Sequence, residues 1–189
     1  MSFGKNDNML IIPNTANPPR IDGVWSTSTE WTDASETKIV ENGMTAYLRA
    51  KHDERFVYVL IDFVSDQSLD ESGDWAVLCF DTKNGDGKAP LNDDYCFYIA
   101  TRTNRITSGI MQGNGKGWTG IQDAKLVGQF AKMSYSHFSM YDNTNMHVSS
   151  EFKIPLRSYG LEEKMGFYIY LNNGYHNSVL EWPVNAGGK

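Results

Sequence analysis

TAYLRAKHDERFVYVLIDFV, residues 45–64, is the stretch that decides the fold class. Small or apolar residues alternate with Tyr47, Arg49 and Lys51 in its first half, and its second half is apolar on both alternating faces. These patterns predict two strands, at residues 45–52 and 56–64, with the turn at Asp53-Glu54-Arg55. The second strand of this hairpin is expected to be central in its sheet, because neither of its faces is wholly polar.

Similar patterns recur along the rest of the chain, while the 3.6-residue period of an amphipathic helix is hard to find. A second hairpin is predicted from residues 74–81 and 94–101, and later strands at residues 123–127, 132–137, 145–155 and 165–172. One short helix is expected near residues 26–30. The sequence therefore predicts an all-β, antiparallel β-sandwich with jelly-roll or immunoglobulin-like layers and at most one or two short helices.

The composition is typical of one soluble globular domain, which we expect to span residues 1–189. Aromatic residues make up 13%, which fits both strands and ligand-stacking surfaces. The net charge is -6 and no run of basic residues occurs, so that a nucleic-acid partner is excluded. No stretch approaches the ~20 apolar residues of a membrane-spanning helix.

The loop of the second hairpin concentrates oxygen donors of the kind that calcium prefers. They are Asp81, Asn84, Asp86, Asp93 and Asp94, around a Gly-rich turn. The spacing is not that of an EF-hand, so the sequence predicts either a structural calcium site of its own kind or an ordinary solvated turn, for which Asn-Gly and Asp-Gly are also typical.

The two cysteines are linked to the same loop by strand register. If Asp81 faces Asp94 across the hairpin, Cys79 faces Cys96. A cross-strand disulfide is then feasible, but we expect two free or half-buried thiols, which are at least as common.

No catalytic constellation is found in the sequence. There is no GxSxG elbow, no HExxH and no phosphate-binding loop, so that an enzyme is not expected. The four histidines show no metal-ligand spacing.

Aromatic side chains with no clear place in the core are the candidates for ligand binding. Successive side chains of a strand point to opposite faces. In residues 165–172 this alternation places Phe167, Ile169 and Leu171 in the core and turns the tyrosines to the opposite face. The alternative is that loops or a second layer cover this face. The residues that we expect to contact a ligand are Arg49, Trp75, Tyr98, Trp118, Tyr168 and Tyr170.

Four segments together resemble the family 9 carbohydrate-binding modules and the related DOMON-like sandwich domains, some of which bind haem. The likeness is carried by Pro19-Arg20-Ile21-Asp22-Gly23 with Trp25 and Trp31, by residues 48–62, by residues 77–94, and by residues 151–167 from Glu151-Phe152-Lys153-Ile154-Pro155 onward. The resemblance implies a β-sandwich, often with bound calcium, in a secreted or surface protein.

The resemblance does not extend to the sugar clamp of the family. In its sugar-binding members two tryptophan rings hold the ligand, and here the first position falls near residues 71–73, while the chain ends before the second. The acidic and basic residues usual in that site fall at Val77 and Tyr98.

The leading hypothesis is a non-catalytic, calcium-stabilised binding module that works outside the cell, at the cell surface or in the periplasm, with carbohydrate as its ligand. A haem-carrying electron-transfer domain is the alternative, with Met111, Met133 and His137 as candidate ligand types. A purely structural surface or assembly domain is the third hypothesis. Fold analogy supports the architecture more directly than it supports any of these functions.

Overall fold

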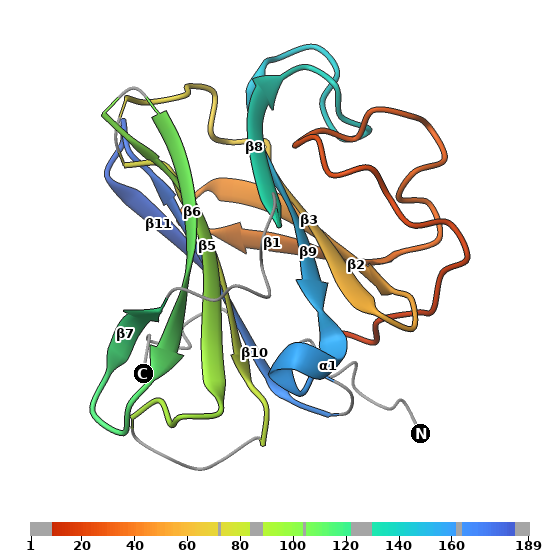
Figure 1. Cartoon of the computed structure of the whole chain (residues 1–189). Coiled ribbons are helices and arrows are strands. Elements are labelled where there is room, and N and C mark those ends of the chain that lie inside the picture. The colour runs from red at the N-terminus through yellow and green to blue at the C-terminus, as the bar shows by residue number, and fades with distance from the viewer. Residues whose placement is uncertain are drawn as a thin grey trace, which may run out of the picture.

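The computed structural model describes residues 9–71, 73–83, 89–103, 105–121, 130–161 and 164–183. Within these ranges two antiparallel sheets pack face to face, which confirms the predicted β-sandwich (Figure 1). The described residues include one short helix, α1 (Leu156–Tyr159), which follows Pro155 and ends at Gly160 in the left-handed conformation. No helix of this part of the chain is long and apolar enough to cross a lipid bilayer.

The first sheet has five strands with the apolar strand of the opening hairpin at its centre. Val59 and Ile61 of that strand face the core, and Tyr58 and Leu60 are buried on its other face, as the sequence pattern predicted. In spatial order the strands are β1 (Ser35–Glu41), β2 (Met44–His52), β3 (Phe56–Phe63), β9 (His147–Pro155) and β8 (Ala131–Ser136).

The second sheet has six strands, and the predicted second hairpin forms its middle. Asp81 pairs with Asp94 and Cys79 with Cys96, so that the predicted register is confirmed. In spatial order the strands are β11 (Ser178–Trp182), β10 (Gly166–Asn173), β4 (Trp75–Asp81), β5 (Asp94–Arg102), β6 (Arg105–Gly113) and β7 (Trp118–Ile121).

One apolar layer fills the space between the sheets. Leu48 and Phe152 from the first sheet and Leu78, Phe97 and Ile169 from the second are almost completely buried in it. Burial of such side chains contributes about 1.5–3 kcal/mol each and fixes which face of each strand points inward. The opposite faces of the two sheets are therefore the places where a site can form.

Several local predictions are wrong or incomplete. Residues 26–30 form turns and no helix, because the carboxylate of Glu30 accepts hydrogen bonds from the backbone N–H groups of Arg20 and Ser26 and holds the segment in a loop. The predicted strand at residues 123–127 lies outside the described residues. Strands β1, β6, β7 and β11 were not predicted, because they lie at or next to the edges of the sheets, bury few side chains and give a weak period-two signal.

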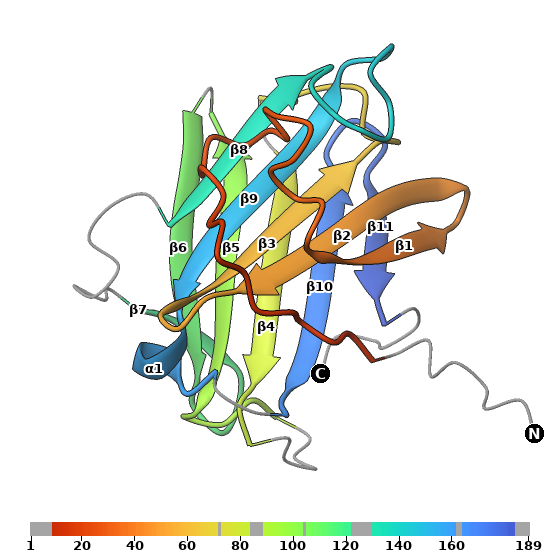
Figure 2. The same cartoon turned by 90° about the vertical axis from the view of Figure 1, so that its right-hand side faces the viewer.

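The N-terminal segment, residues 9–34, crosses the outer face of the five-stranded sheet (Figure 2). The buried carboxylate of Glu151 on β9 holds it there, since it accepts hydrogen bonds from the N–H groups of Asp22 and Gly23, both at 2.8 Å, and from the indole of Trp31 at 3.0 Å. The segment occupies this face, and the outer face of the six-stranded sheet carries the larger open groove.

Candidate functional site

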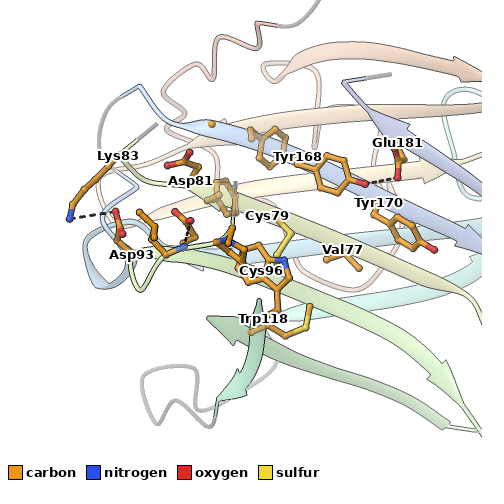
Figure 3. A pocket seen from close by; sticks show the side chains of 18 of the residues that line it. Val77, Cys79, Asp81, Lys83, Asp93, Cys96, Trp118, Tyr168, Tyr170 and Glu181 are labelled. Carbon is orange, nitrogen blue, oxygen red and sulfur yellow. Dashed lines mark hydrogen bonds and ion pairs between the residues drawn. A yellow bond between two sulfur atoms is a disulfide. The ribbon is translucent and has the colours of Figure 1, made fainter. Parts of the chain in front are cut away.

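A groove of about 890 Å³ runs over the outer face of the six-stranded sheet, near the ends of β4, β5 and β10 (Figure 3). Its lining comes from strands on both sides of the central hairpin, including Tyr168 and Tyr170 of β10 and Trp118 of β7. Three of the six predicted ligand-binding residues therefore lie in one groove. Its volume is in the range of small-molecule sites.

Tyr168 and Tyr170 project from the outer face of β10, as the sequence predicted. The Tyr168 hydroxyl donates a hydrogen bond to Oε1 of Glu181 on β11 at 2.6 Å (Figure 3). Burial raises the pKa of Tyr168, and the acceptor carboxylate of Glu181 adds to the rise. The ring is thus fixed in a neutral, hydrogen-bonded state and offers its face to the groove.

A disulfide between Cys79 and Cys96 lies on the floor of the groove. The prediction of free thiols is wrong. The two residues are directly opposite in neighbouring strands, with Cα atoms 4.0 Å apart, so that both sulfur atoms lie on the same face of the sheet. The floor around them is completed by Val77 and Met111, which makes it apolar.

The predicted calcium loop borders one end of the groove. Asp81 and Asp94 lie opposite each other, and Oδ1 of Asp94 is buried without a hydrogen-bond partner. Burial raises the pKa of Asp94 and the carboxyls of Asp81 and Asp93 add to the rise, while the N–H of Leu91 opposes it. Two of the predicted ligands are therefore brought together on neighbouring strands.

The other predicted calcium ligands are not assembled in the same way. Asp93 lies beside Lys83, with a distance of 3.5 Å between the carboxylate and the ammonium group (Figure 3). Asn84 and Asp86 lie outside the described residues. The described part of the loop thus supplies two facing carboxylates and one that is already paired.

Gly113 explains how this loop closes over the sheet. A Cβ atom at this position would collide with the backbone of Pro90 and Leu91. The absence of a side chain lets residues 89–91 lie directly against β6, and the groove gains its rim there.

Trp75 and Tyr98 share the face of the groove but do not line it. Their rings are 5.8 Å apart, and the guanidinium of Arg102 lies 5.0 Å from the centre of the Trp75 ring. The Tyr98 ring lies over Gly109, where a side chain would collide with it. These aromatic residues mainly pack against one another, although they extend the same surface.

Arg49, which was predicted to contact a ligand, belongs to a different surface from the groove. It lies on the outer face of the five-stranded sheet, where it donates to the carbonyl of Trp31 at 2.7 Å and to the Tyr141 hydroxyl, and pairs with Glu36. Strand alternation correctly placed Arg49 on the non-core face of its strand, but alternation does not say which of the two sheets carries the groove.

Glu181 was missed as a site residue. It lies on β11, an edge strand that was not predicted, and so its position beside Tyr168 was hidden. The position of Glu181 between the apolar residues Leu180 and Trp182 could have indicated a strand with Glu181 on its outer face.

The residue types considered for haem are not brought together. Met133 belongs to the core between the sheets, whereas Met111 lines the groove on the outer face of the other sheet. The ring of His137 lies against Phe138. These three residues thus form no common axial-ligand pair.

The fold and the groove define a β-sandwich domain with one covered sheet face and one that carries an aromatic groove. The chain matches no protein-family model and no curated protein. Among the solved structures that share its fold are two of family 9 carbohydrate-binding modules from Caldicellulosiruptor kristjanssonii.

The structure in complex with cellotriose is 14% identical, with a TM-score of 0.57 over 94% of this chain and 85% of that chain. The structure in complex with glucose is 15% identical, with a TM-score of 0.57 over 93% of this chain and 87% of that chain. The predicted resemblance is thus confirmed for the fold: this chain has the fold of the family 9 modules.

Proposed function

We propose that this chain is a non-catalytic binding module that takes a carbohydrate in the groove of the six-stranded sheet. The observation that carries the proposal is the combination of aromatic rings and carboxylates around one open, apolar floor. Sugars present apolar C–H faces, which pack on aromatic rings, and hydroxyl groups, which donate to carboxylates. Tyr170 and Trp118 supply rings, while Asp94 and Glu181 supply acceptors.

The two structures of the same fold support the ligand class, since they were solved with cellotriose and with glucose. The chain differs from the clamp expected of the family, because Val77 and Tyr98 replace the acidic and basic residues there. Val77 pairs with Tyr98 on one side and with Tyr170 on the other. Of these three residues Val77 and Tyr170 line the groove, so a sugar there would be held by apolar and ring contacts, with hydrogen bonds from the edges of the groove.

We also propose that the module works in an oxidising compartment, such as the cell exterior or the periplasm. The disulfide between Cys79 and Cys96 supports this, because disulfides persist in such compartments and are rare in a reducing cytosol. Calcium at the Asp81 and Asp94 carboxylates would offset their repulsion and stiffen the rim of the groove.

Calorimetric titration with glucose, cellotriose and a panel of oligosaccharides tests the proposal. We expect binding by the wild-type chain and a loss of about ten-fold or more in affinity for Tyr170→Ala and Trp118→Ala, which corresponds to about 1.4 kcal/mol. Tyr175→Ala is the matched control, because Tyr175 is 73% exposed and does not line the groove.

Equal affinity of the wild type and both groove variants would reject the groove as the site. An absence of binding across a glycan array would favour a structural surface domain. A Soret band in the purified protein would favour the haem alternative instead.

A further inference from the structure

The groove of the six-stranded sheet carries an excess of acidic side chains. Its described lining has four carboxyl groups and one ammonium group, from Asp81, Asp93, Asp94, Glu181 and Lys83. The whole chain is more balanced, with 23 acidic and 17 basic residues. The ammonium group of Lys83 lies 3.5 Å from the Asp93 carboxylate, so that it offsets an acid of the same lining. The field that this groove presents to a ligand is therefore negative.

The acidic side chains lie at both ends of the apolar floor (Figure 3). Asp81 and Asp93 lie at the end where the loop forms the rim, and Glu181 lies at the other end, beside Tyr168 and Tyr170. Charges beside an apolar surface are screened less by water than charges in free solution. A ligand with an apolar body and positively charged groups therefore matches this lining better than a neutral one does.

The Glu181 end combines carboxylates with aromatic rings. Glu181 lies directly opposite Tyr170 in the pairing of β11 with β10, and its Oε1 accepts from the Tyr168 hydroxyl at 2.6 Å. A second carboxylate is close by, because Oε2 of Glu41 accepts from the backbone N–H of Glu181 at 2.9 Å. Burial raises the pKa of Tyr168 most, and Glu181 and Glu41 both add to the rise.

These two carboxylates have no basic side chain as a close partner in the part of the chain that the structure describes. None of its ion pairs includes Glu41 or Glu181. An ammonium group of a ligand at this end of the groove would gain a charge-assisted hydrogen bond from Glu181 and a cation–π contact with the ring of Tyr170. The arrangement thus favours a positively charged ligand group over a neutral hydroxyl.

We propose that the carbohydrate bound in this groove is an amino sugar with a free amine, such as an oligosaccharide of glucosamine. The inference rests on the proposed function, because it names the class of sugar for the same groove. The pyranose C–H groups pack on the rings and the apolar floor, and the ammonium group pairs with Glu181. Acetylation of the amine removes the positive charge, and with it the preference for this ligand.

Calorimetric titration with the trimers of glucosamine, of N-acetylglucosamine and of glucose tests the preference. At about pH 6 the free amine is protonated, and a chelator keeps divalent cations away from the acidic side chains. We expect the glucosamine trimer to bind about ten-fold more tightly than either neutral trimer. This difference should shrink as the salt concentration rises, because salt screens the attraction between the ammonium groups and the carboxylates.

Substitutions at the two ends of the groove sharpen the test. Glu181→Gln removes the charge and keeps a polar side chain beside Tyr168, so we expect the affinity for the glucosamine trimer to fall about five-fold and that for cellotriose to stay within about two-fold. Glu54→Gln, at an exposed acid outside the groove, is the matched control and should change neither affinity. Lys83→Gln, at a side chain that is 78% exposed, should raise the affinity for the glucosamine trimer about two-fold, and it reports on the charge even if Glu181→Gln folds poorly.

The outcomes separate this inference from the proposed function. Equal affinity for the three trimers overturns the preference for an amine and leaves a carbohydrate-binding groove. Binding of no sugar at all removes both proposals together. Trilysine that binds as tightly as the glucosamine trimer also overturns the inference, because the groove would then recognise positive charge without a sugar ring. A ten-fold preference that persists unchanged in Glu181→Gln and in Lys83→Gln overturns the assignment of the amine to this groove.

Discussion

The outer faces of the two sheets carry similar kinds of residues, but they differ in what covers them. On the five-stranded sheet, Lys51, Glu151 and His147 are at most 1% exposed beneath the N-terminal segment and the loops beside it. On the six-stranded sheet, Tyr168, Tyr170 and Trp118 are only partly buried and line an open groove.

The buried charged side chains of the covered face have partners within the chain. The Lys51 ammonium donates to the carbonyls of Asn17 and Glu30, at 2.8 and 2.6 Å, and to Oδ1 of Asp33 at 2.8 Å. Because these groups already have partners, we assign them to stability. The groove leaves the rings of Tyr170 and Trp118 only partly buried, so it is the face on which a ligand gains contacts.

The largest expected effect comes from Glu151 on the covered face. Glu151→Ala leaves three N–H donors unpaired, and since each costs about 1–3 kcal/mol, we expect the free energy of unfolding to fall by about 3 kcal/mol or more. Urea denaturation measures it. Glu181→Ala in the groove is the control, with an expected loss below about 1 kcal/mol. Equal losses would remove the distinction between the two faces.

The ion pair of His147 and Asp62 should make the covered face sensitive to pH. Burial alone lowers the pKa of His147, but the hydrogen-bonded carboxylate of Asp62 outweighs it and raises that pKa above its ordinary value. The stabilisation is therefore fully present below about pH 6.5, the pKa of the unfolded state, and is lost as the pH rises through the higher folded-state pKa.

His147→Gln removes this dependence and, at pH 6, should cost about 3 kcal/mol, because Asp62 is left buried and uncompensated. Melting curves from pH 5.5 to pH 9 check the expectation. The Tm difference between wild type and variant should shrink as the pH rises. Parallel profiles would mean that the pair stays in one protonation state over this range.

The smallest effect concerns Arg49, which was predicted to bind a ligand. Its guanidinium lies 4.7 Å from the centre of the Trp25 ring and bonds to the N-terminal segment. We expect Arg49→Ala to lower the free energy of unfolding by about 1–2 kcal/mol and to leave sugar affinity unchanged. A loss of affinity equal to that of Tyr170→Ala would instead connect Arg49 to the site.

Much of the framework of the candidate site could be predicted from the sequence. Strong alternation of apolar and polar residues identified both hairpins. Because the numbers of facing residues in an antiparallel pair add to a constant, the pairing of Asp81 with Asp94 also placed Cys79 opposite Cys96. The same reasoning turned Tyr168 and Tyr170 away from the core. These successes share a cause, since strand parity is a local property with period two.

The features that the sequence did not predict depend on contacts between distant segments. The disulfide was missed because register alone does not decide between thiols and a bond. Glu181 was missed because a short edge strand buries too little to give a pattern.

The sequence by itself determined the sandwich, its central hairpins and the inward face of each main strand, because apolar periodicity and turn residues act over neighbouring positions. The tertiary structure alone decided that the N-terminal segment covers one sheet and that a groove remains on the other. That choice rests on hydrogen bonds such as those from Asp22 and Gly23 to Glu151, between residues more than 120 positions apart in the chain.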